Sequence, residues 1–508
     1  MLSTVNSTGR LLFVPLDSRP CCSLFVQRLA EFRGLKLCMP PAEWFGNLEC
    51  RGSSEQLWAW LREQDDGLPA LLSADMLLWG GLVGSRRPAD LEENQRQSLL
   101  KNLNYLGERG NTYAFSTIMR VAPTQKTTGE IQEAELLVKA SRLLASHYGD
   151  LDILKEAFAA NQAQEYLESQ GIKLSNQVWR DYLKQRQHKN AANLALISAW
   201  KQARDSSYLL FGHDDCQTQG LNLLESSVLQ EAARDCGGIS FTTGTDELAQ
   251  LLLARCAAPG QTVSVVWNKE DACDLVTRYE DCSLGEVMRR QAQVTKTVLD
   301  FSDDNEQCEK VLFVWGPWGS VQEESFCQRD AHWPAIPDSF NAFFDKIEDA
   351  LDAGKSVVLA DVAYANGGDC SLVKHLLERK LLTRLSGYAA WNTSGNTLGT
   401  ALSALLMLPD NVDRSSFLAY KRFLLERVLD DCIYESMVRP QLIRAMGGSF
   451  RPLSERETEV LQKRIKEKLW HVYKLYTANM PLHIGVKDIS VRLPWRRLFE
   501  AEISVEVE

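Results

Sequence analysis

Acidic, basic and amide side chains gather directly after short apolar runs in this 508-residue chain. Asp17 and Arg19 follow the first run, Asp75 follows a later one, and the triplet His213-Asp214-Asp215 ends another. Two carboxyl groups in one site push their pKa values apart, which produces an acid and a base. Hydrolysis of a glycosidic bond uses such a carboxyl pair, so this is the first chemistry that these residues suggest.

Two loops in the second half of the chain, at 361–369 and 387–400, carry similar side chains. Their candidate ligand-binding residues are Asp361, Asn366, Asp369, Trp391, Asn392 and Asn396. A helix needs one capping residue, whereas the second loop offers five Asn, Thr and Ser side chains at a helix start, so we expect a ligand there. Tryptophans also fall in such loops, and an aromatic face beside hydroxyl-binding groups suits a sugar ring. These tryptophans are Trp79, Trp267, Trp315, Trp318 and Trp391.

Three arginines in the loops, Arg19, Arg86 and Arg120, offer a different chemistry. A guanidinium can hold a carboxylate or a phosphate through two parallel hydrogen bonds. Carboxylates are also oxygen ligands for Mg²⁺ and Mn²⁺. A metal-assisted hydrolase or lyase that acts on a small anionic substrate is therefore an alternative. Its metal would be surrounded by Asp17, Asp75, Asp214 and Asp361.

The elements that must position these residues follow one repeated pattern: a short apolar or β-branched run, a loop, and then an amphipathic stretch. The pattern is typical of βα units and a parallel sheet. Ligand sites in such folds lie at the carboxyl ends of the strands, where the candidate residues fall. We expect strands at 11–16, 35–38, 70–74, 113–119, 208–212, 239–243, 263–266, 310–314, 356–360 and 386–390.

Ten strands are too many for one small domain, so we predict an α/β fold with two parallel-sheet domains. The first is expected at 8–270 with a helical insertion at about 125–204, and the second at 271–410. A mostly helical region at 411–508 ends in a strand, because 500–507 alternates as an edge strand would. A decorated (β/α)8 barrel over the first two-thirds is the alternative. Helices are expected at 23–32, 91–109, 221–234, 246–256, 341–353 and 398–408.

The composition excludes several classes of protein. With 45% hydrophobic and 24% charged residues, the chain is of the soluble globular type. Its 56 basic and 67 acidic residues give a net charge of −11, so we expect neither nucleic acid nor an anionic membrane as a partner. We find no secretory signal and no apolar run long enough to span a bilayer. The 13 cysteines include no CxxC pair, which argues against a disulfide framework and favours a cytoplasmic protein.

Several well-known catalytic motifs are missing from the sequence. No GxxxxGK[ST] loop occurs, so ATP hydrolysis is not supported. The first strand is followed by Pro15-Leu-Asp-Ser-Arg-Pro20 in place of GxGxxG, which argues against a nicotinamide enzyme. No GxSxG elbow follows a strand, and no HExxH or HxH spacing suggests a zinc hydrolase.

Four stretches of the sequence look familiar: the PLDSRP motif at 15–20, the segment 75–86, the segment 361–369, and YAAWNTSGNTLGTAL at 388–402. They resemble a bacterial family catalogued as domain of unknown function 4127, and Leu493-Pro-Trp-Arg-Arg-Leu-Phe-Glu500 is similar to that family as well. The resemblance covers essentially the whole chain. It implies a bacterial, cytoplasmic protein, and it supplies no catalytic residues.

The sequence thus predicts a carbohydrate-active enzyme, most specifically a glycoside hydrolase acting on a small sugar or amino sugar. The catalytic pair would be Asp215 with Asp75 or Asp361. The expected substrate-binding residues are Asp17, Arg19, Arg86, Arg120, Asp214, Trp315, Asn366, Asp369, Trp391, Asn392 and Asn396. No cofactor is required and no metal ligand is assigned, although the alternative above would use Mg²⁺ or Mn²⁺. A non-catalytic sugar sensor with the same site is a third hypothesis. The oligomeric state is left open.

Overall fold

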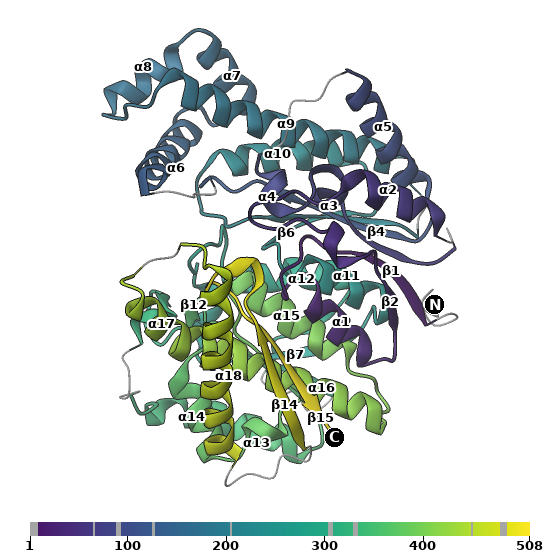
Figure 1. Cartoon of the computed structure of the whole chain (residues 1–508), viewed down its shortest axis with the longest axis vertical. Coiled ribbons are helices and arrows are strands. Elements are labelled where there is room, and N and C mark those ends of the chain that lie inside the picture. Colours follow the sequence, from purple (N-terminus) through teal and green to yellow (C-terminus); the bar gives the residue numbers. More distant parts are fainter. Residues whose placement is uncertain are drawn as a thin grey trace.

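Two parallel β-sheets with helices around them form the body of the protein (Figure 1). The computed structural model describes residues 9–64, 67–87, 93–123, 128–203, 206–302, 308–328, 334–448, 451–477 and 485–508. Each sheet is built from successive βα units, as the sequence pattern indicated. The α/β fold class with two sheet domains is confirmed, and the barrel alternative is wrong because neither sheet closes on itself.

The first sheet has six strands in the order β2-β1-β3-β4-β5-β6, and all neighbours run parallel. Both of its faces are covered by helices, so its central strands consist of nearly continuous apolar residues. The strands are β1 (Arg10–Val14), β2 (Lys36–Cys38), β3 (Ala70–Ser73), β4 (Thr112–Ile118), β5 (Tyr208–His213) and β6 (Ile239–Thr243).

The second sheet repeats the topology of the first. Its order is β8-β7-β9-β11-β13, so counting along the chain it runs second, first, third, fourth, fifth, like the first five strands of the first sheet. In both sheets the order reverses between the first and third strands, where ligands bind in open α/β sheets. The strands are β7 (Thr262–Trp267), β8 (Val298–Asp300), β9 (Lys310–Trp315), β11 (Ser356–Asp361) and β13 (Gly387–Ala389).

The helices of the first half include an inserted helical layer. In the insertion, Leu137, Leu144 and Trp179 belong to a small apolar core of their own. Figure 1 shows α6, α7 and α8 projecting from the rest of the first half. The helices packed on the sheet are α1 (Leu24–Glu31), α2 (Ser54–Glu63), α3 (Ala74–Trp79), α4 (Leu82–Ser85), α5 (Glu93–Glu108), α10 (Leu221–Ala233) and α11 (Leu248–Ala257). The inserted helices are α6 (Thr128–Tyr148), α7 (Leu151–Ala159), α8 (Gln162–Ser169) and α9 (Asn176–Trp200).

The second half ends in a helical layer and an antiparallel hairpin. The helices are α12 (Leu284–Thr295), α13 (Asn341–Asp352), α14 (Cys370–Glu378), α15 (Ser394–Met407), α16 (Arg414–Arg427), the π-helix η7 (Val428–Val438), α17 (Arg439–Ala445) and α18 (Glu455–Thr477). The hairpin consists of β14 (Val486–Arg492) and β15 (Glu502–Val507). A separate small parallel pair is formed by β10 (Glu323–Glu324) and β12 (Tyr364–Ala365). Short 3₁₀ turns are η2 (Ala42–Trp44), η3 (Glu270–Asp274), η4 (Ser325–Cys327), η5 (Asp338–Phe340), η6 (Leu382–Arg384) and η8 (Pro494–Arg496).

The two halves share one apolar core rather than touching only at a linker. Phe13 of β1, Leu252 of α11, Val314 of β9 and Leu402 of α15 belong to the same cluster of buried residues. Helices α1, α11 and α15 contact one another and lie between the two sheets (Figure 1). The geometry between the halves is therefore fixed by packing, and a site at their junction is held in place.

Each of the ten predicted strands overlaps a strand of the structure. The predicted strand at 263–266 corresponds to β7, which pairs with β8 and β9 in the second sheet. The change from one sheet to the other therefore comes before β7 rather than at the boundary we expected near 270. The predicted final strand corresponds to β15, but its partner β14 and the edge strand β8 were not foreseen. Among the residues described, no helix combines the length and the apolar character needed to cross a membrane.

Candidate functional site

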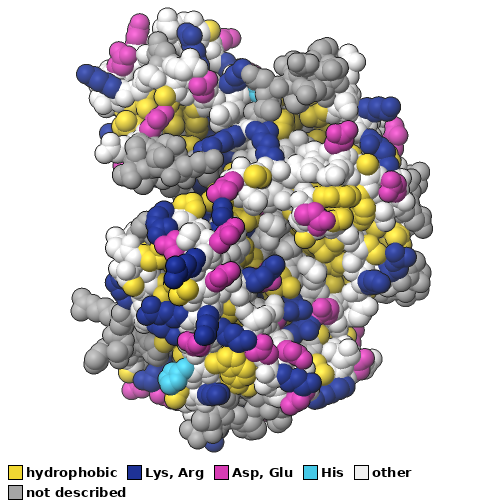
Figure 2. All heavy atoms as spheres, in the orientation of Figure 1, with side chains coloured by type: hydrophobic (Ala, Val, Ile, Leu, Met, Phe, Trp, Pro, Cys, Tyr) yellow, Lys and Arg dark blue, Asp and Glu magenta, His cyan; other side chains and the backbone are white. Residues whose placement is uncertain are grey.

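A cavity of about 490 Å³ lies at the carboxyl ends of the strands of the first sheet. The loops after β1, β4, β5 and β6 contribute to its wall, together with α4 and the segment after β14. Its polar and aromatic lining residues are Arg19, Arg86, Arg120, Asp214, Asp215, Gln217, Thr245, Asp246, Tyr279, Asn392, Arg451, Trp495, Arg497 and Phe499. Figure 2 shows that the surface is hollowed between the helical insertion and the second half of the chain.

One end of the cavity is built from two arginine–aspartate pairs. The Arg86 guanidinium donates from Nε and Nη2 to the two oxygens of Asp214, at 2.6 and 2.7 Å. Arg120 donates from Nη1 to Asp215 at 2.5 Å and from Nε to the carbonyl of Ala122 at 2.9 Å. The Asp214 side chain is buried, whereas the Asp215 side chain is 31% exposed. Asp215 is therefore the more accessible carboxylate of the two.

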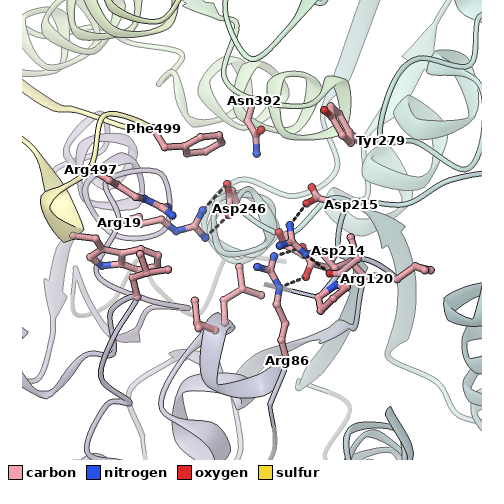
Figure 3. Close-up of a pocket in the computed structure, with 18 of the residues that line it drawn as sticks. Arg19, Arg86, Arg120, Asp214, Asp215, Asp246, Tyr279, Asn392, Arg497 and Phe499 are labelled. Carbon is pink, nitrogen blue, oxygen red and sulfur yellow. Dashed lines mark hydrogen bonds and ion pairs between the residues drawn. The ribbon is translucent and has the colours of Figure 1, made fainter. Parts of the chain in front are cut away.

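The other end is organised around Arg19. Its guanidinium donates to both carboxylates beside it, with distances of 2.9 Å to Asp17 and 2.7 Å to Asp246. The indole of Trp391 donates to Asp246 at 3.2 Å, so that carboxylate is held from two sides. Figure 3 shows Arg19 and Asp246 facing one end of the cavity and the Arg86 and Arg120 pairs facing the other. Arg19 therefore joins the loop after β1 to the loop after β6.

The C-terminal segment supplies the aromatic part of the wall. Arg497 donates from Nε and Nη2 to Glu500 at 2.8 Å each, and its guanidinium lies 4.6 Å from the ring centroid of Trp495 and 5.2 Å from that of Phe499. Trp495 in turn donates its indole N–H to Ser18 at 2.9 Å. This bond joins the last part of the chain to the loop after β1, which places the two rings on the cavity.

Positive and negative charges are paired in the part of the cavity wall that the structure describes. There, five arginines and three aspartates line the cavity, and the carboxylates of Asp17 and Glu500 lie directly behind Arg19 and Arg497. Burial alone would raise the pKa of Asp214, but Arg86, Arg120 and Arg19 outweigh it and lower that pKa below its ordinary value. Burial would likewise raise the pKa of Asp246, but the Arg19 guanidinium and the hydrogen bond from Trp391 outweigh it, so the pKa of Asp246 is also lowered. Both carboxyl groups are therefore ionised at neutral pH.

Four of the lining residues have an unusual backbone. Asp215, Tyr279, Asn392 and Trp495 adopt left-handed conformations, with φ values of 35°, 66°, 59° and 55°. Such a conformation costs a residue with a side chain about 1–3 kcal/mol, and it persists where the surroundings enforce it. Strain of this kind clusters at binding and catalytic sites. Its concentration on one cavity is a second reason to consider the cavity functional.

Six of the predicted site residues line this cavity: Arg19, Arg86, Arg120, Asp214, Asp215 and Asn392. Asp17 and Trp391 stand just behind the wall, where they hold Arg19 and Asp246. The prediction that residues after different strands converge is correct for these positions. The physical reason is the common edge at which parallel strands end.

The predicted catalytic partners of Asp215 are not beside it. Asp75 is fully buried, pairs with the Lys189 ammonium and accepts a hydrogen bond from the backbone N–H of Thr117 at 2.7 Å. Asp361 belongs to the second sheet and is also fully buried. The catalytic pair that we expected is therefore not assembled in the structure.

The other residues predicted from 361–369 form a separate buried cluster. Asp361 accepts a hydrogen bond from the Tyr388 hydroxyl at 2.8 Å, and Asp369 accepts one from the Trp315 indole at 3.0 Å. Asp369 also caps α14. Asn366 donates its amide to Glu324 at 2.8 Å. None of these residues is among those that line the cavity, so the structure does not bring them together with the candidate site.

The Asn- and Thr-rich loop before α15 is mainly a helix start. Thr393 and Asn396 form a reciprocal capping box, and Asn396 donates its amide to the buried Glu247 at 2.6 Å. Ser394 and Thr397 are buried as well. Of this loop's candidate residues, Asn392 lines the cavity and Asn396 does not.

The predicted Mg²⁺ or Mn²⁺ shell is not formed either. Asp17, Asp75 and Asp214 each accept hydrogen bonds from a cationic side chain, which occupies the oxygens that a metal would need. Asp361 lies at the end of β11 in the other sheet. The four carboxylates therefore do not converge on one point.

Sequence reasoning did not name Tyr279, Trp495, Arg497 or Phe499 as site residues, although all four line the cavity. The tryptophans that it favoured for stacking on a sugar are not lining residues, and Trp79, Trp315 and Trp391 are buried. The signal that could have found the true aromatic wall was the dense Trp-Arg-Arg-Leu-Phe run at 495–499.

Comparison with known proteins supports the family resemblance. Residues 11–504 match the profile of a family described as "Protein of unknown function (DUF4127)". The chain belongs to this family. No curated protein and no solved structure matches the chain. The match covers both sheets, the cavity and the C-terminal aromatic segment, so the whole site lies within the family region.

Proposed function

We propose that this protein is a carbohydrate-active enzyme that binds a small sugar or amino sugar in the cavity of the first sheet. The observation that carries the proposal is the arrangement of the cavity's charges as arginine–carboxylate pairs beside aromatic rings. Asp215 is the proposed reacting carboxylate, because it is the most exposed of the paired acids described above.

The paired charges match the needs of a hydroxyl group. A hydroxyl both donates and accepts a hydrogen bond. A guanidinium beside a carboxylate offers a donor and an acceptor a few ångströms apart, as at Arg120 and Asp215. Because the positive and negative groups balance, an uncharged polar molecule can be enclosed without leaving an unpaired charge buried. A polyol or a sugar satisfies this pattern better than a simple anion.

The aromatic end supplies the second requirement of sugar binding. Trp495 and Phe499 line the cavity near Arg497, and Tyr279 lines it from another loop. Sugar rings present C–H groups on their faces and hydroxyl groups at their rims. An aromatic face at one end and charged pairs at the other suit such a molecule.

The proposed role of Asp215 is that of a base or a nucleophile. In a two-carboxylate glycoside hydrolase, the second carboxyl must be protonated to assist the leaving group. Asp214 and Asp246 do not meet this requirement, since their pKa values are lowered despite burial, by Arg86 and Arg19 respectively. Glycosidic bond hydrolysis is therefore the narrower form of the proposal, and it needs a proton donor other than these two carboxyls.

One observation favours a second candidate, an acidic sugar or a sugar phosphate. Burial and the neighbouring Arg86 guanidinium lower the pKa of Arg120, so the two positive charges disfavour each other. An anionic group between them would relieve this repulsion. The ligand would then place its anion at the Arg86 and Arg120 end and its ring near Trp495.

A thermal-shift screen tests the proposal and separates the two candidates. The panel contains neutral sugars, amino sugars, sugar phosphates and inorganic phosphate. A ligand at 100 times its dissociation constant stabilises the folded protein by about 2.7 kcal/mol. Stabilisation by a neutral sugar supports the first candidate, whereas stabilisation that requires a phosphate supports the second. If no member of the panel raises the melting temperature, the proposal fails.

A sugar identified in this way is then tested for turnover with Asp215→Asn. We expect sugar binding to persist while turnover falls at least a hundredfold. Asp152→Asn is the matched control, because Asp152 is 82% exposed on α7. Full turnover by Asp215→Asn would remove Asp215 from the mechanism. Binding without turnover by the wild-type protein would favour the sensor hypothesis.

A further inference from the structure

Three potential metal ligands converge beneath the loop that carries Asp214 and Asp215. The Nδ1 atom of His213 lies 3.3 Å from the Cys216 Sγ atom and 3.3 Å from an oxygen of Asp281. The three donor atoms all lie within 4.8 Å of one another. The side chains of His213 and Asp281 are 3% and 8% exposed, and Cys216 is buried. None of the three lines the cavity.

These spacings fit a tetrahedral zinc ion. Zinc binds histidine nitrogen at about 2.0–2.1 Å, carboxylate oxygen at about 2.0–2.2 Å and cysteine sulfur at about 2.3 Å. At tetrahedral angles, those lengths separate neighbouring ligand atoms by about 3.3–3.6 Å. The two distances from His213 Nδ1 agree with this geometry. The three side chains could therefore bind zinc without a large rearrangement.

The surroundings hold these ligands in the orientation that a metal needs. The Nε2 atom of His213 is 2.8 Å from the Ser226 hydroxyl, and a hydrogen bond there leaves the Nδ1 lone pair for a metal. Asn222 donates its amide to Cys216 Sγ at 3.0 Å. Arg290 donates to the Asp281 carboxylate at 3.4 Å. Partners of this second layer are typical of protein zinc sites.

The charges of the three ligands also favour a divalent cation. A thiolate and a carboxylate bring two negative charges to a buried place, a neutral histidine adds none, and the positive charge beside them, on Arg290, belongs to a side chain that is 31% exposed. A divalent cation cancels the two negative charges, and burying a neutral cluster costs far less than burying separate charges. Zinc is also the divalent ion that this mixture of sulfur, nitrogen and oxygen ligands suits best.

We propose that His213, Cys216 and Asp281 bind one Zn²⁺ ion, with a water molecule in the fourth position. The ion ties the loop after β5 to the segment before α12, which belongs to the second half of the chain. The backbone N–H of Cys216 also donates to the carbonyl of Tyr279 at 2.9 Å, so the two segments already touch. They carry Asp214, Asp215 and Tyr279 to the cavity, and the metal fixes their relative positions.

A second group of possible ligands, Cys21, Cys22 and Asp246, does not support the same inference. The Arg19 guanidinium donates to Asp246 at 2.7 Å and to Cys22 Sγ at 3.3 Å. A cation already occupies the place where a metal would bind. In the group around His213, the Arg290 guanidinium donates to the Asp281 carboxylate at the longer distances of 3.4 and 3.5 Å, so that group is the stronger candidate.

The test measures metal on the full-length protein and needs no knowledge of the substrate, so it can succeed or fail independently of the proposed function. The purified protein is stripped with a chelator, equilibrated with Zn²⁺, desalted and analysed by mass spectrometry. We expect one zinc per chain in the wild type and in Cys256→Ala, a buried cysteine outside the trio. Cys216→Ala and His213→Ala should each bind zinc at least tenfold more weakly. A wild type that retains no zinc, or a Cys216→Ala variant that retains one equivalent, would overturn the proposal.

Cobalt substitution keeps the proposal testable if the variants do not fold. Co²⁺ bound to a thiolate gives a charge-transfer absorption band in the near ultraviolet, whereas Co²⁺ bound only to nitrogen and oxygen does not. We expect this band in the wild-type protein, with an intensity that saturates at one cobalt per chain. Saturation without the band would exclude Cys216 as a ligand and overturn the assignment.

Discussion

The first five strands of the first sheet have the same order as the five strands of the second, yet the carboxyl edges of the two sheets differ in what lies against them. The edge of the first sheet opens onto the cavity, whereas the edge of the second is filled by Trp315, Tyr388 and the Asp361 and Asp369 carboxyl groups. The π-helix η7 closes it, because Asp431 of η7 accepts a hydrogen bond from the Ala390 N–H at 2.8 Å. Polar residues at the ends of parallel strands therefore make a site only where no other element covers them.

The carboxyl groups at the two edges also differ in their partners. At the first edge Asp214 is paired with a guanidinium, and its pKa is lowered although burial opposes this. At the second edge burial raises the pKa of Asp361, the neighbouring Asp369 raises it further, and the hydrogen bonds to Asp361 come from neutral groups. The first edge thus holds charged pairs that can meet a polar ligand, whereas the raised pKa of Asp361 at the second edge favours its neutral form.

Among the substitutions, the largest expected effect on stability comes from breaking a charged pair of the first edge. Asp214→Asn removes the buried carboxylate that pairs with the partly buried Arg86 guanidinium, and we expect the free energy of unfolding to fall by about 3 kcal/mol, the lower end of the range for a buried pair. Urea denaturation measures this change. The double variant Arg86→Gln with Asp214→Asn should recover part of the loss, because it removes both charges.

The same substitution at the second edge is the matched comparison. Asp361→Asn replaces a group that the folded protein holds in its neutral form, so it removes no charge pair. We expect a loss clearly smaller than that of Asp214→Asn. Equal losses for the two variants would contradict the distinction between charged and neutral carboxyl groups at the two edges.

The difference between the two edges also explains how much of the fold and of the candidate site could be predicted from the sequence. The strands were predictable because apolar runs and turn residues are local signals, and Asp214, Arg86 and Arg120 followed from their places after strands. The closing of the second edge by η7 depends on the hydrogen bond between Ala390 and Asp431, which are 41 residues apart in the chain. Trp495 reaches the cavity through a bond to Ser18, 477 residues away. No local pattern encodes such contacts.

A change in pH should also affect stability, because the neighbouring carboxyl groups of Asp246 and Glu247 have pKa values shifted in opposite directions. Burial raises the pKa of Glu247 to about 8, whereas Asp246, one residue earlier, has a lowered pKa because Arg19 outweighs burial. The folded protein binds the Glu247 proton more tightly than the unfolded chain does. The free energy of unfolding therefore falls as pH rises from about 4.5 to about 8, by roughly 4 kcal/mol from this group.

Glu247→Gln removes this titration, so its denaturation midpoint should depend less on pH than that of the wild type over this range. Chemical denaturation at pH 5, 6.5 and 8 provides the measurement. Asp413→Asn is the control, because hydrogen bonds from Ser416 lower the pKa of Asp413 and this group is not among those that shift Glu247. Its loss should change stability below the ordinary carboxyl range and leave the slope between pH 5 and 8 unchanged. An identical slope in Glu247→Gln and wild type would show that Glu247 is ionised in the folded protein.

The smallest expected effect distinguishes the aromatic residues of the two edges. Trp495 lines the cavity, whereas Trp315 is fully buried at the end of β9 among Phe340, Phe343 and Phe344. For a sugar found in the screen, Trp495→Ala should weaken binding about tenfold, since an aromatic contact contributes about 0.5–1.5 kcal/mol. Trp315→Phe should lower the melting temperature and leave the dissociation constant unchanged. Calorimetric titration and thermal melting of both variants separate the two roles. Weaker sugar binding by Trp315→Phe alone would place the ligand at the second edge, and the assignment of the cavity as the site would then be wrong.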